Sequence, residues 1–165
     1  MKEKIKKYTR EFLLFIIWLV VISNIISIYK SQDLNKERLT INNFTLIDGT
    51  NYKVASNKPI LLHFWATWCP TCKMEASNID TISKDYELIT VAVQSGEDKK
   101  IKTYMKENNL SFKVINDNSG LLSQKFNIEV FPSTFIYDKD KNLLFSEVGY
   151  TSSFGLKLRM FWTSL

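Results

Sequence analysis

The 165-residue chain has few of the residues on which unusual architectures depend, with only 2 cysteines, 5 glycines and 3 prolines. So little glycine and proline argues against a collagen-like or loop-dominated chain. Two cysteines are too few for a small domain held together by several disulfides in place of a core. With 45% hydrophobic residues, the chain has the material for a buried core, and its length suits one globular domain plus a short segment.

Excess positive charge is also scarce outside the N-terminal region. The net charge is +5, but residues 1–38 hold 8 Lys and Arg against 4 Asp and Glu, while residues 39–165 hold 14 against 13. A nucleic-acid-binding domain needs clustered positive charge to contact phosphates. The near neutrality of residues 39–165 therefore argues against a nucleic-acid partner.

An uncharged apolar run over residues 12–29 follows a basic N-terminus over residues 1–11. About 17 helical residues suffice to cross the hydrocarbon core of a bilayer, so this run predicts a transmembrane helix. No Ala-x-Ala-like site follows it, and we expect an uncleaved anchor instead of a removed signal peptide. Because basic flanks remain in the cytoplasm, residues 1–11 should lie inside and the rest of the chain outside. The polar residues 30–38 then predict a linker to a domain over residues 39–165.

The domain alternates the patterns of strands and helices. Continuous apolar runs predict buried strands at residues 60–65 and 88–93. We expect a helix over 70–84, because proline suits a first helical turn, and another that Ser95 caps and that continues to about residue 108. The other expected elements are an N-terminal strand or hairpin within 39–55, a strand at 112–115, a short helix at 119–126, a hairpin of 133–137 and 143–148, and a terminal helix at 151–162. This order predicts an α/β fold with a mixed central sheet flanked by helices.

Both cysteines lie where the buried strand passes into the helix that begins at Pro70. A thiolate is the nucleophile of disulfide exchange, and the free N–H groups of a helix N-terminus favour an anion. We therefore expect Cys69 to be the attacking thiol, exposed and acidic, and Cys72 to be shielded. The spacing lets Cys72 resolve the mixed disulfide that Cys69 forms. Pro70 and Thr71, between the thiols, should tune the reduction potential.

Metal binding is the alternative of a different class. Thiolates suit Cu(I), so the pair alone also fits a copper- or zinc-binding module. A structural zinc site needs about four ligands, however, and the chain has two cysteines and the single His63, which stands at no recognised ligand spacing. No Met-rich or His-rich tract supports dedicated metal handling. We expect no metal ligands and no cofactor other than the Cys69–Cys72 disulfide.

The segment FWATWCPTCKME resembles the thioredoxin superfamily, and within it the TlpA/ResA/DsbE-like group of membrane-anchored bacterial proteins. The likeness covers about residues 39–165. The stretches VINDNSGLLSQKFNIEVFPSTFIYDKDK and VGYTSSFGLKLRMFW are similar to the ScsD-like branch of protein disulfide oxidoreductases. The resemblance implies a thioredoxin-like domain on the periplasmic face of the inner membrane. It also implies protein thiol and disulfide substrates, and a membrane electron donor or acceptor that recharges the pair.

Several site residues are implied only by this resemblance. Pro132 is similar to the family's cis-proline, which faces the dithiol, although an ordinary loop proline is the alternative. Glu75 matches a glutamate near the cysteines and would exchange protons with Cys72, with a solvated helix acid as the alternative. The expected substrate contacts are Trp68, Pro70, Thr71 and Phe131.

Two departures from the family leave questions open. His63 replaces the buried acid of thioredoxin itself, and either packs as a neutral histidine or serves as a base. The segment NIEVFPST around Pro132 differs from the GVxGxPET of the cytochrome c maturation reductases, which share the Cys-Pro-Thr-Cys centre. Cytochrome c maturation is therefore the runner-up function. Since Glu75 disfavours further negative charge nearby, we expect a reductant or isomerase in preference to a general oxidant.

Overall fold

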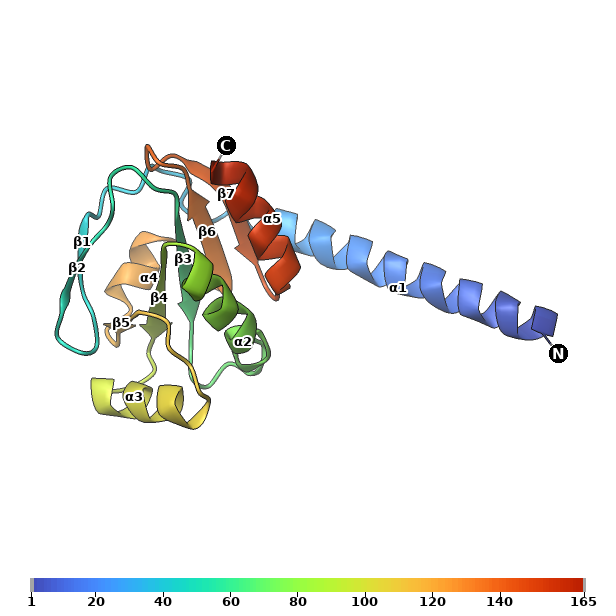
Figure 1. Ribbon diagram of the computed structural model, residues 1–165, viewed down its shortest axis with the longest axis horizontal. Coiled ribbons are helices and arrows are strands. Elements are labelled where there is room, and N and C mark those ends of the chain that lie inside the picture. Colours follow the sequence, from blue (N-terminus) through green and yellow to red (C-terminus); the bar gives the residue numbers. More distant parts are fainter. Residues whose placement is uncertain (1, 165) are drawn as a thin grey trace.

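The computed structural model describes residues 2–164, in which one long helix is joined to an α/β domain (Figure 1). Helix α1 spans Lys2–Lys30 and projects away from the domain. Within its 20-residue segment Tyr8–Ser27, an 18-residue window reaches a mean hydropathy of 1.9, and none of that window is buried inside the protein. By length and composition, this helix can cross a membrane.

A mixed five-stranded sheet forms the centre of the domain, with the strand order β5-β4-β3-β6-β7. Strands β3, β4 and β5 are parallel, whereas β6 pairs antiparallel with β3, and β7 pairs antiparallel with β6. The strands span Ile60–Trp65 (β3), Leu88–Val93 (β4), Val114–Asp117 (β5), Ser133–Tyr137 (β6) and Leu143–Val148 (β7). Every residue of β3 and β4 is buried, because both faces of the sheet are covered.

The two faces of the sheet carry separate apolar clusters. Helices α2 (Pro70–Asp85), α3 (Asp98–Glu107) and α5 (Ser153–Ser164) pack on one face through residues such as Ile79, Ile101 and Leu156. The other face is covered by the hairpin of β1 (Asn43–Thr45) and β2 (Asn51–Lys53), and by Phe126 at the end of α4 (Leu121–Lys125). This arrangement confirms the predicted α/β fold, its mixed sheet and the N-terminal hairpin.

The predicted strands at 60–65, 88–93, 133–137 and 143–148 are confirmed with the same bounds, while other elements differ. Strand β5 covers residues 114–117 instead of 112–115, because its register with β4 pairs Val114 with Thr90. The prediction that Ser95 caps the next helix is wrong. Its hydroxyl donates to the Val93 carbonyl at 3.0 Å and accepts from the Thr67 amide at 3.0 Å, so α3 begins only at Asp98.

The expected linker, residues 30–38, begins with the last residue of α1, and the rest of it packs on the domain. Leu34 is buried in the core cluster that also contains Phe126. The Asn35 amide donates to the Phe126 carbonyl at 3.2 Å, and the Arg38 guanidinium donates to the Asp140 carbonyl at 2.7 Å. In α1 itself, the Ser27 hydroxyl accepts a hydrogen bond from the Val148 amide at 3.2 Å. The long helix therefore meets the domain directly at the end of β7.

Candidate active site

Cys69 and Cys72 form a disulfide at the start of α2. Cys69 is the N-cap residue in an extended conformation, and its sulfur accepts a hydrogen bond from the Cys72 amide at 3.1 Å. Pro70 occupies the first turn, where its missing N–H leaves no helix hydrogen bond unmade. The structure thus places the pair where the sequence predicts it. The expected difference in exposure is wrong for this oxidised state, because Cys69 is 5% exposed and Cys72 is 2% exposed.

Contacts on both sides hold the loop that leads into the disulfide. The Trp68 indole donates to the Gln94 carbonyl at 3.1 Å, and its ring meets Phe131 edge-on with 5.6 Å between the ring centres. The Thr67 amide donates to the Ser95 hydroxyl at 3.0 Å. The end of β4 and the segment before β6 therefore fix the approach to Cys69. Ser95, which pattern reasoning assigned to helix capping, belongs to this support.

The four expected substrate contacts surround the disulfide and differ in exposure. Trp68 and Pro70 are exposed, whereas Thr71 and Phe131 are partly buried. Phe131 also packs against the apolar cluster that contains both cysteines. The Phe131–Pro132 peptide bond is cis, as predicted, and Pro132 is buried. The sequence thus brings an aromatic pair and a proline loop to the mouth of the disulfide.

Glu75 is completely buried, one helical turn after Cys72 on the inner face of α2. Its Oε1 accepts a hydrogen bond from the Thr151 amide at 2.9 Å, whereas its Oε2 has no hydrogen-bond partner among the described residues. Burial raises the pKa of Glu75 to about 8, and the nearby charge of Glu147 acts in the same direction. The solvated-acid alternative is therefore wrong. A carboxyl group with this pKa exchanges protons near neutral pH.

The surroundings of Glu75 come from a distant part of the chain. Glu147 accepts from the Thr151 hydroxyl at 2.9 Å and forms an ion pair with Arg159 of α5. No short-range pattern connects these residues with Glu75, because more than seventy residues separate them. The sequence contained one indication that this region matters to the site: the segment from Val148 onward resembles the C-terminal segment of the ScsD-like proteins.

His63 is buried in β3 and lies between Thr90 and Thr134 in the sheet register. Its Nδ1 is 2.9 Å from the Thr134 hydroxyl. Burial lowers the pKa of His63 to about 3, so the ring is neutral at physiological pH. The structure supports the packed-histidine interpretation, and the ring adds no positive charge near the cysteines.

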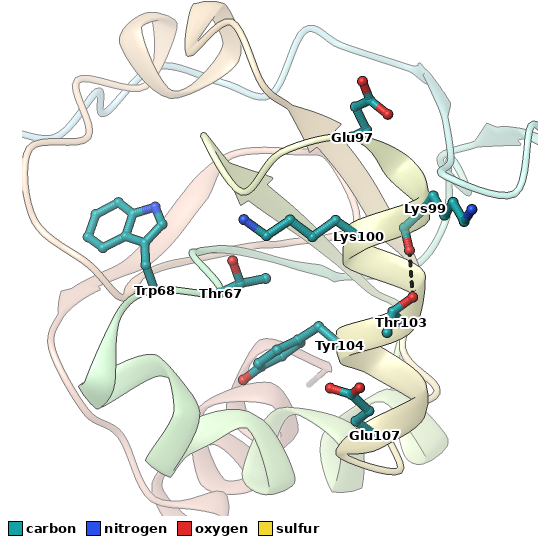
Figure 2. Close-up of a pocket in the computed structure, with 8 residues that line it drawn as sticks. All are labelled: Thr67, Trp68, Glu97, Lys99, Lys100, Thr103, Tyr104 and Glu107. Carbon is teal, nitrogen blue, oxygen red and sulfur yellow. Dashed lines mark hydrogen bonds between the residues drawn. The ribbon is translucent and has the colours of Figure 1, made fainter.

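A cavity of about 680 Å³ lies between the active-site loop and α3. Figure 2 shows Trp68 and Thr67 on one side, with Lys100 reaching across from α3 and Tyr104 on the same side as Lys100. The other lining residues are Glu97, Lys99, Thr103 and Glu107. Because Trp68 precedes Cys69 directly, this cavity has room for part of a molecule bound at the disulfide. Within residues 2–164, no three His, Cys, Asp or Glu side chains gather as a metal site would require.

Comparison with known proteins finds relatives that share a thioredoxin-like or thiol–disulfide oxidoreductase description. The model of the AhpC/TSA family matches residues 33–146. A "Thioredoxin-like protein" of Haemophilus influenzae is 33% identical over 165 residues, covering 96% of each chain. The "Sporulation thiol-disulfide oxidoreductase A" of Bacillus subtilis is 25% identical and covers 67% of this chain and 72% of its own. The crystal structure of StoA from Bacillus subtilis superimposes with a TM-score of 0.60 at 24% identity, covering 74% and 95% of the two chains.

The buried Glu75 predicts an unusual pH dependence of stability. The pKa is about 8 in the folded chain and near 4.5 when unfolded, so only the folded state holds the proton between these values. Stability should therefore fall as pH rises through this window. Between pH 5 and 8.5, the oxidised wild type should lose about 2–4 kcal/mol of unfolding free energy relative to Glu75→Gln.

Denaturant unfolding in detergent at both pH values measures this difference. His63 is present in both proteins, so its own titration cancels from the comparison. The matched control is Glu129→Gln, which removes an exposed glutamate and should follow the wild type. Parallel pH profiles for wild type and Glu75→Gln would contradict the raised pKa.

Proposed function

Because the chain belongs to the AhpC/TSA family and is a thioredoxin-like thiol–disulfide oxidoreductase, we propose that it reduces or isomerises disulfides of protein substrates through Cys69 and Cys72. The observation that carries this proposal is the Cys69–Cys72 disulfide at the N-terminus of α2, where β3 ends beside Trp68 and Phe131. The disulfide itself is the redox group, and the proposal requires no further cofactor.

The exchange would begin when the Cys69 thiolate attacks one sulfur of a substrate disulfide. The Cys72 N–H, which donates to the Cys69 sulfur, and the helix N-terminus would stabilise the negative charge on that thiolate. The attack breaks the substrate S–S bond, forms a mixed disulfide with Cys69 and releases one substrate thiolate. Cys72 then attacks Cys69 as a thiolate and releases the second substrate thiolate. Two electrons pass to the substrate, and the Cys69–Cys72 disulfide returns.

Glu75 is the proposed proton acceptor for Cys72. Cys72 must lose its proton before it can resolve the mixed disulfide, and it is nearly inaccessible to water. Glu75 lies one turn along the same buried face of α2, and its Oε2 has no hydrogen-bond partner in the part of the chain that the structure describes. With a pKa near 8, Glu75 is mostly protonated at neutral pH, and its ionised fraction, which grows towards pH 8, would accept the proton of Cys72 and later return it.

The substrate would bind across the exposed edge formed by Trp68, Pro70, Thr71 and Phe131. The ring pair of Trp68 and Phe131 offers an apolar contact beside the disulfide, and Pro132 holds the Phe131 backbone in place. Gly149 supports this segment, because its amide donates to the Pro132 carbonyl at 2.8 Å. The cavity next to Trp68 extends the binding surface towards α3.

The charges near the cysteines favour a reductant or isomerase. A strong oxidant has a very acidic attacking thiol, which requires positive charge close to the sulfur. Here His63 is neutral and the buried side chain nearest along the helix is the acid Glu75. Positive potential comes from Lys73, from the helix N-terminus and from Lys100 at the cavity beside Trp68. A thiolate beside Glu75 should therefore be only moderately stabilised.

The proposed location is the outer face of a bacterial cytoplasmic membrane. Residues 12–29 of α1 would be the anchor, residues 1–11 would remain inside, and residues 30–38 would lead to the domain over 39–165. A membrane electron donor would then reduce the Cys69–Cys72 disulfide after each turnover. The direct contact between α1 and β7 would keep the domain close to the bilayer.

We expect Cys72→Ser to accumulate mixed disulfides with substrate proteins in cells, because the attacking thiol remains and the resolving thiol is lost. Cys69→Ser is the matched control and should trap little. Non-reducing electrophoresis followed by identification of the partners measures the outcome, and stronger trapping by Cys69→Ser would reverse the assignment. Trapped partners rich in Cys-x-x-Cys-His segments would assign the protein to cytochrome c maturation.

We expect the reduction potential of the pair to lie nearer the reductants, about −270 mV, than the strong oxidants, about −120 mV. The reason is the buried acid next to a cysteine pair that has little positive charge around it. Equilibration with glutathione buffers, read by thiol alkylation, measures the potential. A value near −120 mV with rapid oxidation of a reduced unfolded protein would contradict the reductive direction.

We expect external protease to digest the domain in intact spheroplasts and to leave the N-terminal residues protected, because the basic flank holds residues 1–11 inside. Immunoblotting with tags at each end measures this, and a cytoplasmic protein provides the control for intact cells. Full protection of the domain would show that the topology is inverted.

A further inference from the structure

Helix α5 has two apolar faces, of which the domain covers only one. Leu156 and Met160 are buried against the sheet. The opposite face exposes Phe154 (76%), Leu158 (55%), Phe161 (57%) and Trp162 (68%). With 3.6 residues per turn, these four side chains fall within an arc of about 100°. An outer helix of a soluble domain normally presents polar residues there, so this face needs an apolar environment.

The charged side chains of α5 border the apolar face and leave it uninterrupted. Lys157 lies on one side, paired with Asp85 at 2.9 Å, and Arg159 lies on the other, paired with Glu147. Tyr150, just before the helix, extends the exposed aromatic character towards β7. Because both basic groups are paired within the domain, the face offers apolar and aromatic contact instead of a binding site for a charged partner.

The first turn of α5 lies beside the apolar part of α1. A cavity of about 730 Å³ separates the two helices, and α1 contributes Leu19, Val20, Asn24 and Ser27 to its wall. The facing wall includes Tyr150, Ser152, Gly155 and Arg159. Ile26 and Lys30 of α1 also line the cavity, and all six residues except Lys30 belong to the span Tyr8–Ser27. The start of α5 therefore lies beside the outer part of the proposed membrane segment. Figure 1 shows α5 running across the direction of α1, as a helix lying along a membrane surface would.

We propose that Phe154, Leu158, Phe161 and Trp162 form a lipid-facing surface, through which α5 lies in the outer interface of the bilayer that α1 crosses. Interfacial helices bury an apolar face with Phe, Leu and Trp at the boundary between headgroups and acyl chains, and aromatic residues concentrate there. We assign lipid as the partner of this surface because α5 lies beside α1, the helix that crosses the membrane in the proposed topology. This inference rests on the membrane anchoring proposed above.

A second membrane contact would fix the orientation of the disulfide. The segment before α5 is bonded to α2, since the Asn78 side chain donates to the Tyr150 hydroxyl at 3.0 Å and the Thr151 carbonyl at 3.2 Å. The Thr151 amide in turn donates to Glu75. A helix resting on the bilayer would therefore hold α2, and Cys69 at its start, at a constant height above the lipid. The single span α1 alone would leave the tilt of the chain relative to the bilayer unfixed.

Fluorescence quenching in lipid nanodiscs tests this contact on the full-length chain. Trp18→Phe removes the indole of the span, and emission is compared between nanodiscs of ordinary lipid and of lipid brominated on its acyl chains. We expect a loss of emission in the brominated lipid. The matched control, Trp18→Phe with Trp162→Phe, should lose much less, because Trp65 is buried and Trp68 lies at the active site.

The remaining outcomes separate this inference from the proposed function. Equal emission of Trp18→Phe in the two lipids overturns the surface, and a blue-shifted but unquenched Trp162 means that protein, such as a second copy, covers it. If alkaline carbonate washes the chain from membranes, the anchor and the lipid-facing surface are both wrong.

Quenching without disulfide exchange in the same nanodiscs contradicts the proposed function and leaves the lipid-facing surface supported. A triple change of Phe154, Leu158 and Phe161 to Ser should reduce the quenching of Trp162.

Discussion

The burial of β3 in the middle of the sheet is the constraint on which the site depends. Every residue of this strand is inaccessible to water, and β4 and β6 pair with it on its two sides. The register of the strand is fixed by close packing on both faces, because a shift of one residue would misfit its side chains in both apolar clusters and part His63 from the Thr134 hydroxyl. The position of Trp65 in turn fixes where the chain leaves the sheet. Cys69 consequently begins α2 with its sulfur against the Cys72 amide.

Two opposing electrostatic effects meet within one turn of α2. The helix N-terminus favours a negative charge on Cys69 by about 0.3–2 kcal/mol. Burial acts against charge on Glu75 and raises its pKa from 4.5 to about 8, a larger effect at roughly 1.4 kcal/mol per pKa unit. Burial thus disfavours a negative charge on Glu75 more strongly than the helix N-terminus favours a negative charge on Cys69. This balance favours a thiolate on Cys69 at the helix N-terminus, while Cys72 keeps its proton until a base can accept it.

Local patterns predicted the elements and missed the long-range contacts. The apolar runs of β3 and β4 and the proline at the start of α2 are local signals, so the strand bounds and the site of the cysteines were predictable. The burial of Glu75 was not, because it depends on Thr151 and Glu147, which approach α2 only through the packing of β7 and α5. The prediction for Ser95 failed for a similar reason. A serine before a helix suits an N-cap, but the Ser95 hydroxyl accepts its hydrogen bond from the Thr67 amide instead of from the helix. Leu34 also lies within a polar stretch, and only the tertiary fold shows that it is buried.

The segment from Glu147 to Arg159 links the chemistry of the site to the attachment of the chain. The Thr151 amide holds the carboxyl group of Glu75, and the ion pair of Glu147 with Arg159 secures α5 beside it. The Val148 amide of the same segment bonds to Ser27 in α1. A force that tilts α1 against the domain would therefore act first on β7, whose Glu147 is connected to the buried Glu75 by hydrogen bonds through Thr151. Because burial raises the pKa of Glu75 and the hydrogen bond from Thr151 opposes that rise, the packing of this segment sets the pH range in which Glu75 can accept the proton of Cys72.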